Sequence, residues 1–150
     1  MITPLTLPKA NLRLQKIKGV VHVRCIVRKK DLVCTSEEWV RQHFIHYLIN
    51  DRKIPLGLIA SEYPLTYNGR VKRADIVVFN KHQIPVLIVE CKAPKITLNE
   101  ETLFQIAQYN FDLDVDYLCL TNGIDHVYSE INRENGNLRY LTEIPMGITD

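Results

Sequence analysis

An apolar, mostly β-branched run covers Ile84–Val89 and ends abruptly in Glu90, Cys91 and Lys92. Prolines stand at both ends of this stretch, and its composition predicts a buried central strand. Because side chains alternate along a strand, we expect Glu90 and Lys92 to face one way and Cys91 the other. Charges at the edge of a core are costly unless they are paired, hydrated or bound to an ion. The end of this strand is therefore the first candidate for chemistry.

Two segments before the central strand have strand composition, Ile59–Tyr67 and Ala74–Phe79. The first ends in Asn68-Gly69, a dipeptide that is typical of tight hairpin turns. With the central strand they predict an antiparallel meander, in which Asp75 lies next to Glu90 and Lys92.

The ends of the chain predict further strands. Residues 1–18 hold two early prolines and predict an extended basic arm. Val20–Val27 and Leu32–Cys34 predict a β-hairpin, within residues 19–34, that turns at Arg28–Asp31. After the central strand, we expect short strands at Asp116–Leu120, His126–Tyr128 and Leu138–Leu141.

The first predicted helix begins after Thr35, which can cap it, and Glu38 is placed to complete a capping box. Its apolar stripe consists of Val40, Phe44, Tyr47 and Leu48. At about 100° per residue, Glu37 falls on the side of this stripe and Glu38 falls off it. Glu37 is thus expected to face whatever the helix packs on, although both acids also suit a helix N-terminus through its dipole alone.

The second predicted helix is capped by Asn99 and runs to about Phe111. Its buried side is expected to hold the apolar residues Leu103, Phe104, Ile106, Ala107 and Phe111. Gln105 and Tyr109 are four residues apart and therefore share one flank. The predicted elements follow in the order hairpin, helix, three strands, helix and further strands, in one α+β domain.

Composition is ordinary for a globular chain of 150 residues, with 46% apolar residues, 24% charged residues and a net charge of +2. The first 30 residues carry lysines and arginines but no acid, which suits a polyanionic partner or a merely solvated arm. The four cysteines lack metal-site spacing and predict reduced core residues of an intracellular, cytoplasmic protein. We see neither a signal peptide nor a membrane-spanning run, and no phosphate-binding loop of a motor or kinase.

Asp75, Glu90 and Lys92 form the pattern D-x14-E-x-K across two neighbouring strands. Two carboxylates held close together repel each other unless a cation lies between them. Oxygen ligands with room for water suit Mg²⁺ or Mn²⁺, which favours phosphodiester hydrolysis. Glu37 could add a carboxylate, and Gln105 and Tyr109 could hold phosphate or the lysine. Three residues alone are a weak motif, and in most chains they would form only an ion-pair cluster.

The same residues resemble the PD-(D/E)XK nuclease superfamily, and in particular the N-terminal nuclease domain of the type I restriction enzyme R subunit. The resemblance covers about residues 28–130 and rests on five ordered segments, which are 35–42, 73–77, 89–94, 105–110 and 120–123. The fourth segment contains the Q-x-x-x-Y motif of that branch, at Gln105 and Tyr109. Ala74 stands where the superfamily pattern has proline, which leaves the acid unaffected.

The resemblance implies a restriction-endonuclease-like mixed sheet flanked by helices, with a nuclease core at 35–130 and C-terminal strands or tail at 131–150. It implies Mg²⁺ or Mn²⁺ on Asp75, Glu90 and the backbone carbonyl of Cys91, with Lys92 catalytic. The acid of the first helix maps best onto Glu37, with Glu38 as the alternative, and Gln105 and Tyr109 support activity. The expected substrate is DNA, whose contacts we assign to the basic residues Arg28, Lys29, Lys30, Arg70, Lys72 and Arg73.

The resemblance does not extend to a helicase motor, which follows the nuclease domain in type I R subunits. The chain could therefore act alone, as a homodimer, or with separate motor or specificity subunits. The main alternative to a nuclease is a module on a nuclease fold that binds nucleic acid or assembles with partners without cutting. Salt-dependent DNA binding is expected in both cases and cannot distinguish them.

Overall fold

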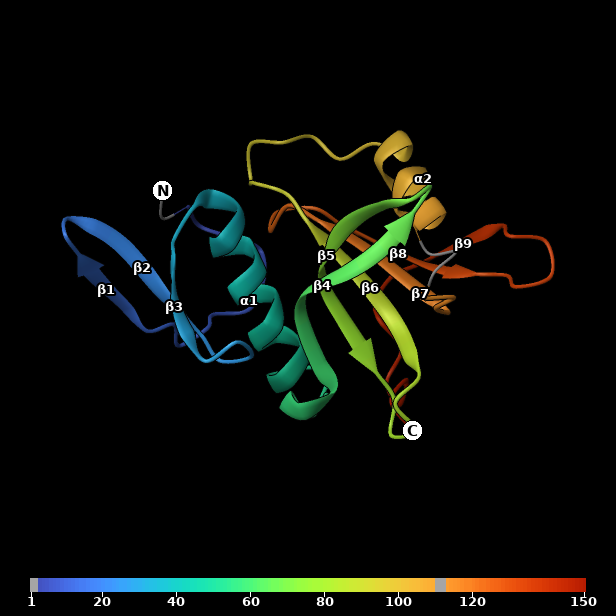
Figure 1. Cartoon of the computed structure of the whole chain (residues 1–150), viewed down its shortest axis with the longest axis horizontal. Helices are drawn as coiled ribbons and strands as arrows, with labels where there is room; N and C mark the ends of the chain where they lie inside the picture. The colour runs from blue at the N-terminus through green and yellow to red at the C-terminus, as the bar shows by residue number, and fades with distance from the viewer. Residues whose placement is uncertain (1–2, 110–112) are drawn as a thin grey trace.

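The structure is a computed structural model and describes residues 3–109 and 113–150. These residues form two β-sheets, two α-helices and one short 3-10 helix, Leu56–Leu58. In Figure 1 the helix α1 lies between the small sheet and the large sheet, and α2 lies against the large sheet. The mixed α+β architecture predicted from the sequence is confirmed.

The small sheet has three antiparallel strands in the order β1 (Leu14–Ile17), β2 (Val20–Cys25) and β3 (Lys30–Val33). The predicted hairpin is therefore present, but its turn lies at residues 26–29, earlier than expected. The prediction that residues 1–18 form only an extended arm is wrong, because residues 14–17 pair with β2. A weak apolar pattern became a strand because a partner strand could satisfy its backbone groups.

The large sheet has six strands in the order of the chain, β4 to β9. All neighbours are antiparallel except β6 and β7, which are parallel and joined through the crossover that contains α2. The predicted meander and the three later strands are confirmed. The strands are β4 (Ile59–Tyr67), β5 (Arg70–Phe79), β6 (Pro85–Cys91), β7 (Tyr117–Thr121), β8 (His126–Ile131) and β9 (Leu138–Leu141).

Helix α1 (Ser36–Asn50) begins as predicted, because the side chain of Thr35 accepts a hydrogen bond from the Glu38 amide at 3.0 Å. Its apolar stripe is buried between the sheets, with Val40, Phe44 and Leu48 fully inaccessible. The reciprocal half of the capping box is absent here. The Thr35 amide donates to the carbonyl of Val33 instead, and the Glu38 carboxylate accepts from Gln42.

Helix α2 (Glu100–Tyr109) is capped as predicted by Asn99, whose side-chain oxygen accepts from the Thr102 amide. Leu103 and Ile106 are buried, but Phe104 is 55% exposed, so its predicted burial is wrong. Phe104 faces outward because the sheet packs against only one side of this helix, the side of Leu103 and Ile106. Phe111 lies outside the described residues. Neither α-helix, over these ranges, is long and apolar enough to cross a membrane.

The two faces of the large sheet carry separate hydrophobic cores. One core joins β5, β6 and β7 to α1 and reaches Cys25 of the small sheet. The other packs Val77, Ile88 and Leu118 against Leu103 and Ile106 of α2. Burial on both faces explains why β6 is apolar up to Glu90. All four cysteines are buried, as the sequence predicted.

The first described residues pack across the loop that follows β7. The amide of Thr6 donates to the carbonyl of Gly123 at 2.9 Å, and the indole nitrogen of Trp39 donates to the carbonyl of Thr3. Gly123 has a φ of +84°, and a Cβ built there would lie 2.7 Å from Cδ2 of Leu5. Glycine therefore permits both the turn and the close approach of this segment.

We expect Gly123→Ala to lower the free energy of unfolding by about 1–2 kcal/mol from backbone strain, and by more if Leu5 cannot move aside. Gly136→Ala is a matched control, because Gly136 has a φ of +74° with nothing within 4 Å of its virtual Cβ. Urea unfolding of both variants measures the difference. Equal losses would show that the contact with Leu5 contributes nothing.

Candidate active site

The candidate site forms where strands β5 and β6 stop pairing. Their backbone ladder ends at Ile76 and Val89, so the next residues, Asp75 and Glu90, lie just beyond the paired region. The Cys91 amide donates to Oδ2 of Asp75 at 2.8 Å, in place of a backbone carbonyl. Because the strands separate here, the side chain of Asp75 can enter the sheet. Its carboxylate then satisfies the buried amide of Cys91.

Glu90 is the buried partner of Asp75, and only 9% of its surface is exposed. Burial first, and then its hydrogen bond and charge contact with Asp75, raise the pKa of Glu90 to about 9. Lys72 and Lys92 oppose this shift through their charges. At neutral pH, and without a further cation, the Glu90 carboxyl therefore keeps a proton beside the Asp75 carboxylate.

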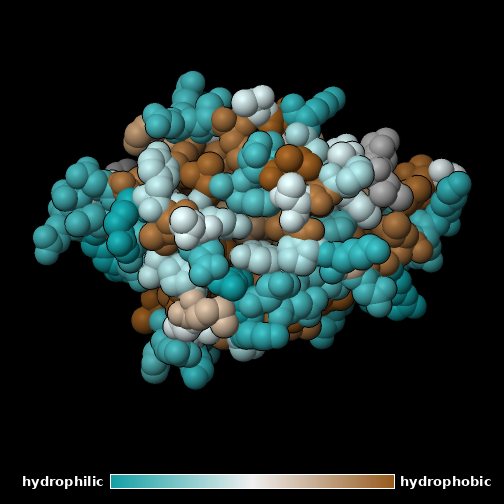
Figure 2. Space-filling view, turned by 180° about the vertical axis from the view of Figure 1, so that it is seen from behind, coloured by the Kyte–Doolittle hydropathy of each residue, from teal (hydrophilic) through white to brown (hydrophobic). Residues whose placement is uncertain are grey.

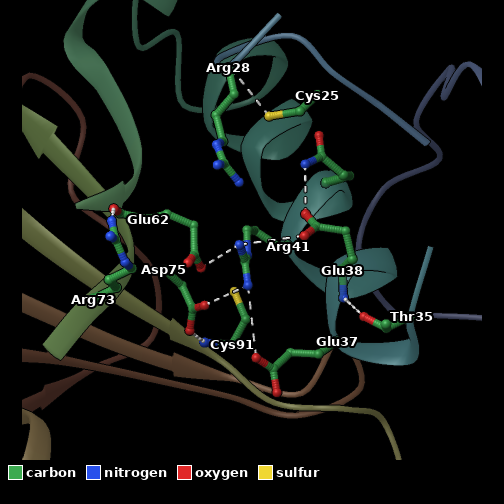
Figure 3. A network of polar contacts seen from close by, with 11 residues as sticks. Cys25, Arg28, Thr35, Glu37, Glu38, Arg41, Glu62, Arg73, Asp75 and Cys91 are labelled. Carbon is green, nitrogen blue, oxygen red and sulfur yellow. Dashed lines mark hydrogen bonds and ion pairs between the residues drawn. The ribbon is translucent and has the colours of Figure 1, made fainter. Parts of the chain in front are cut away.

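A buried arginine, Arg41 of α1, connects the helix to these acids (Figure 3). Its guanidinium lies 2.9 Å from Oδ1 of Asp75 and 2.6 Å from Oε1 of Glu62, and its side chain is only 8% exposed. Burial lowers the pKa of Arg41, but the charges of Asp75, Glu38 and Glu62 outweigh it and leave this pKa above its ordinary value. Arg41 therefore stays charged and fixes the position of Asp75.

Glu62 reaches Arg41 from an unusual backbone conformation. It stands opposite Asp75, where the register of β4 and β5 skips both residues, and its φ is +56°. Its carbonyl accepts a hydrogen bond of 3.3 Å from the guanidinium of Arg73. A positive φ in a residue other than glycine costs free energy, and such strain is found most often at functional sites.

The two acids of α1 take different roles. Glu37 is half-exposed and lies 3.8 Å from Arg41; burial and the charge of Asp75 raise its pKa, while Arg41 and Lys92 lower it. Glu37 therefore lies near the acid cluster, but it is the more exposed of the two acids, and its role as the helix acid stays a prediction. Glu38 was expected to fall off the packed side, but it is buried, and it contacts both Arg41 and Gln42. It is buried because the small sheet covers the second side of α1.

The acid pair fits a hard divalent cation. Asp75 already accepts hydrogen bonds from Arg41 and Cys91, but a carboxylate has about four acceptor positions, so capacity remains. Within residues 3–109 and 113–150, no three His, Cys, Asp or Glu residues are placed to hold a metal ion. Asp75 and Glu90 would be the side-chain ligands of such a cation, with backbone and water supplying the rest, which is usual for Mg²⁺.

The other predicted site residues are more scattered. Lys92 lies close enough to Glu37 and Glu90 to shift their pKa values, and its amide donates to the carbonyl of Thr121. Gln105 is exposed on α2, which packs on the other face of the sheet from α1 (Figure 1). The side chain of Tyr109 lies outside the described part of the structure. The roles of Gln105 and Tyr109 stay predictions.

The predicted DNA-binding residues divide into two groups. Arg28, Lys29 and Lys30 lie at the turn between β2 and β3, from which Arg28 extends toward the acid cluster (Figure 3). Arg70, Lys72 and Arg73 lie on β5 before Asp75. Lys72 is near enough to Glu90 to influence its pKa. Contacts of either group with DNA stay predictions.

Sequence reasoning missed Arg41 and Glu62 as members of the site. For Arg41 a signal was available, because it follows Glu37 by four residues and Glu38 by three on a helix, so it can pair with both. For Glu62 the signal was weak. An acid inside a predicted strand hints at a partner, but no pattern in the sequence predicts a positive φ there.

Two comparisons with known proteins found similar sequences or structures. The family described as "Type I restriction enzyme R protein N terminus (HSDR_N)" matches residues 36–145. A solved fragment assigned to the HsdR subunit of a type I restriction enzyme from Vibrio vulnificus YJ016 is 23% identical, with a TM-score of 0.45. The match covers 59% of this chain and 19% of that one. No protein of curated function matches the chain.

The fold and the site together define a mixed α+β domain with an acid cluster where β5 and β6 separate. More particularly, the family match includes α1, the whole large sheet and α2. The chain belongs to the family of type I restriction enzyme R protein N-terminal domains.

We expect Arg41→Met to lower the free energy of unfolding by about 3–5 kcal/mol, because it leaves buried carboxylates without their cation. In the Asp75→Asn background the same change should lower the free energy of unfolding by less. The difference between the two losses is the coupling energy, which we expect to be about 0.5–3 kcal/mol. Urea unfolding of the four proteins completes the cycle. Strictly additive losses would show that the contact of 2.9 Å contributes no coupling.

The pKa of Glu90 predicts a specific pH dependence of stability. The folded state keeps the Glu90 proton to about pH 9, while the unfolded chain loses it near its ordinary value of 4.5, so stability falls as pH rises across this window. Glu90→Gln removes this loss, which amounts to at most about 1.4 kcal/mol per pH unit. In urea titrations with a metal chelator, the free energy of unfolding of the variant should rise relative to that of the parent as the pH increases to about 9. A constant difference would contradict the burial of a protonated Glu90.

Proposed function

We propose that this domain is a metal-dependent endonuclease of the PD-(D/E)XK type that hydrolyses phosphodiester bonds in DNA. The main observation behind the proposal is the pair formed by Asp75 and buried Glu90, which share a hydrogen bond where two strands separate. An acid pair of this kind costs stability, and a divalent cation in place of its proton would offset the cost. Membership in a restriction-enzyme family adds support.

Each side chain would then have a defined task. Asp75 and Glu90, with the Cys91 carbonyl, would hold Mg²⁺ or Mn²⁺, which supplies Lewis acidity toward a phosphate oxygen and lowers the pKa of a bound water. Lys92 would orient the attacking water and stabilise negative charge on the phosphate. Arg41 would hold Asp75 in place, and Glu37 would act near Lys92 as the helix acid. Gln105 and Tyr109 would support the reaction through phosphate or lysine contacts.

Substrate and partners form the wider part of the proposal. DNA would approach over the basic residues of the β2–β3 turn and of β5. As a member of a restriction-enzyme R protein family, the chain would cut in the cell together with a motor and specificity subunits, or with a second copy of itself. The sequence preference would then come from those partners, and the expected place of action is the cytoplasm.

A second candidate function is a domain that binds nucleic acid or partner subunits without cutting. The observation that favours it is Arg41, which already supplies a positive charge at 2.9 Å from Asp75. An acid cluster neutralised in this way can be a stable structural element that needs no metal. The two candidates differ in one measurable property, because only the nuclease requires a divalent cation on Asp75 and Glu90.

Calorimetric titration of Mn²⁺ together with a plasmid-nicking assay separates the two functions. We expect Asp75→Asn to lose both metal binding and nicking, and Lys92→Ala to bind metal but lose at least about 100-fold in nicking rate. Lys95→Ala is the matched control, because Lys95 is an exposed lysine three residues away, and it should nick like the parent.

Each outcome favours a different function. Metal binding and nicking that both disappear in Asp75→Asn would support the nuclease. Metal binding by the parent without nicking of any tested DNA would indicate a missing partner or substrate. Absence of Mn²⁺ binding by the parent would refute the nuclease and favour the non-cutting domain.

A further inference from the structure

Two adjoining hollows on the small sheet form a basic surface next to α1. One, of about 250 Å³, is lined by Arg13, Leu14, Gln15, Arg24 and Asp31. The other, of about 340 Å³, is lined by Asn11, Arg13, Arg24, Ile26, Lys29 and His46. Because Arg13 and Arg24 line both hollows, we treat them as one feature and call it the arginine groove.

The arginine groove carries an excess of positive charge. Asp31 is the one acid among its lining residues, and it lies 3.8 Å from Arg24 with both side chains about one-third exposed. A pair at this distance and exposure contributes at most about 1 kcal/mol, so Arg24 can exchange it for another anion. Gln15 also donates to Oδ2 of Asp31 at 3.0 Å, so Arg24 shares this oxygen with a second donor.

The backbone holds these cations in fixed positions. The Arg24 amide donates to the carbonyl of Arg13 at 2.9 Å, which continues the pairing of β1 and β2 and places the two arginines side by side. Lys29 has a φ of +57° in the tight turn between β2 and β3, and its amide donates to the carbonyl of Cys25. Charges mounted on paired backbone lose less entropy on binding than charges on a free arm.

The turn at residues 26–29 connects the arginine groove with the candidate active site. Lys29 lines the groove, while its neighbour Arg28 extends toward the cluster of Asp75, Glu62 and Arg41 (Figure 3). In Figure 2, hydrophilic residues are interspersed with apolar ones at the end of the molecule that carries the small sheet, where Leu14, Ile17, Val20 and Val33 are exposed. Lys29 and Arg28 thus place one cation in the groove and the next on the side of the acid cluster.

We propose that the arginine groove binds the phosphate backbone of DNA on the side of α1 away from the acid cluster, and so fixes where the duplex lies. Arginine forks match two phosphate oxygens at once and suit a repeating anion. This inference rests on the proposed function in taking DNA as the polyanion. It does not require cutting, because the groove contains none of the candidate catalytic residues.

The test uses fluorescence anisotropy with a short fluorescein-labelled DNA duplex and a metal chelator, over a range of salt concentrations. We expect Arg13→Gln/Arg24→Gln to weaken binding at least about tenfold at low salt. The slope of log affinity against log salt should fall by about 0.9 for each phosphate that the variant no longer neutralises. Asp31→Asn should act in the opposite direction and tighten binding, because it removes the acid that competes with DNA.

The matched control is Arg133→Gln/Arg139→Gln, which removes the same charge. Arg139 lies on β9, and Arg133 lies between β8 and β9, at the far end of the molecule from the small sheet (Figure 1). Equal losses in the two double variants would overturn the inference, because net charge alone would then explain binding. Unchanged or weaker binding by Asp31→Asn would also overturn it, and this variant does not depend on the folding of the arginine variants.

Failure of this inference can be told apart from failure of the proposed function. Suppose that DNA binding depends on the groove but the protein neither nicks DNA nor binds Mn²⁺. The DNA-binding role of the groove would then be supported and the nuclease function refuted. Nicking that is lost in Asp75→Asn but unaffected by Arg13→Gln/Arg24→Gln, with unchanged duplex affinity, would retain the nuclease and reject the groove.

Discussion

The ion pair between Arg41 and Asp75 is the interaction on which the site depends. It joins α1 to the edge of the large sheet at 2.9 Å, with both side chains more than nine-tenths buried. Desolvation of two charges is expensive, and the cost is recovered only because further hydrogen bonds satisfy both partners. Glu62 shares the guanidinium, and the Cys91 amide donates to the remaining oxygen of Asp75. These contacts fix one acid in place while Glu90 remains protonated beside it.

The arrangement of the sheet explains why the acids can meet at all. Strand β6 is buried on both faces, so a charged residue is tolerable only where the strand leaves its neighbour β5. The parallel neighbour β7 continues to support β6 beyond that point, because the Lys92 amide donates to the carbonyl of Thr121. The backbone of Cys91 and Lys92 is thus held by β7 on one side. On the other side it no longer pairs with the backbone of β5.

Much of the site could be predicted because its residues follow strong local patterns. The apolar strand before Glu90, the hairpin turn at Asn68-Gly69 and the cap at Thr35 are each fixed by neighbouring residues. Burial of Glu38 and exposure of Phe104 were not predictable in this way. Both depend on which sides of a helix are covered. The small sheet covers a second side of α1, whereas the large sheet covers only one side of α2.

The sequence by itself determined the α+β class, the β4–β5–β6 meander and the proximity of Asp75 to Glu90, because periodicity and turn residues act over short distances. Only the tertiary structure decided that Arg41 neutralises the cluster, that Glu62 joins it through a positive φ, and that β1 completes a small sheet with a basic groove. These features depend on contacts between residues far apart in the chain. Such contacts form only when packing brings distant elements together, and a charge that becomes buried there needs partners of opposite charge.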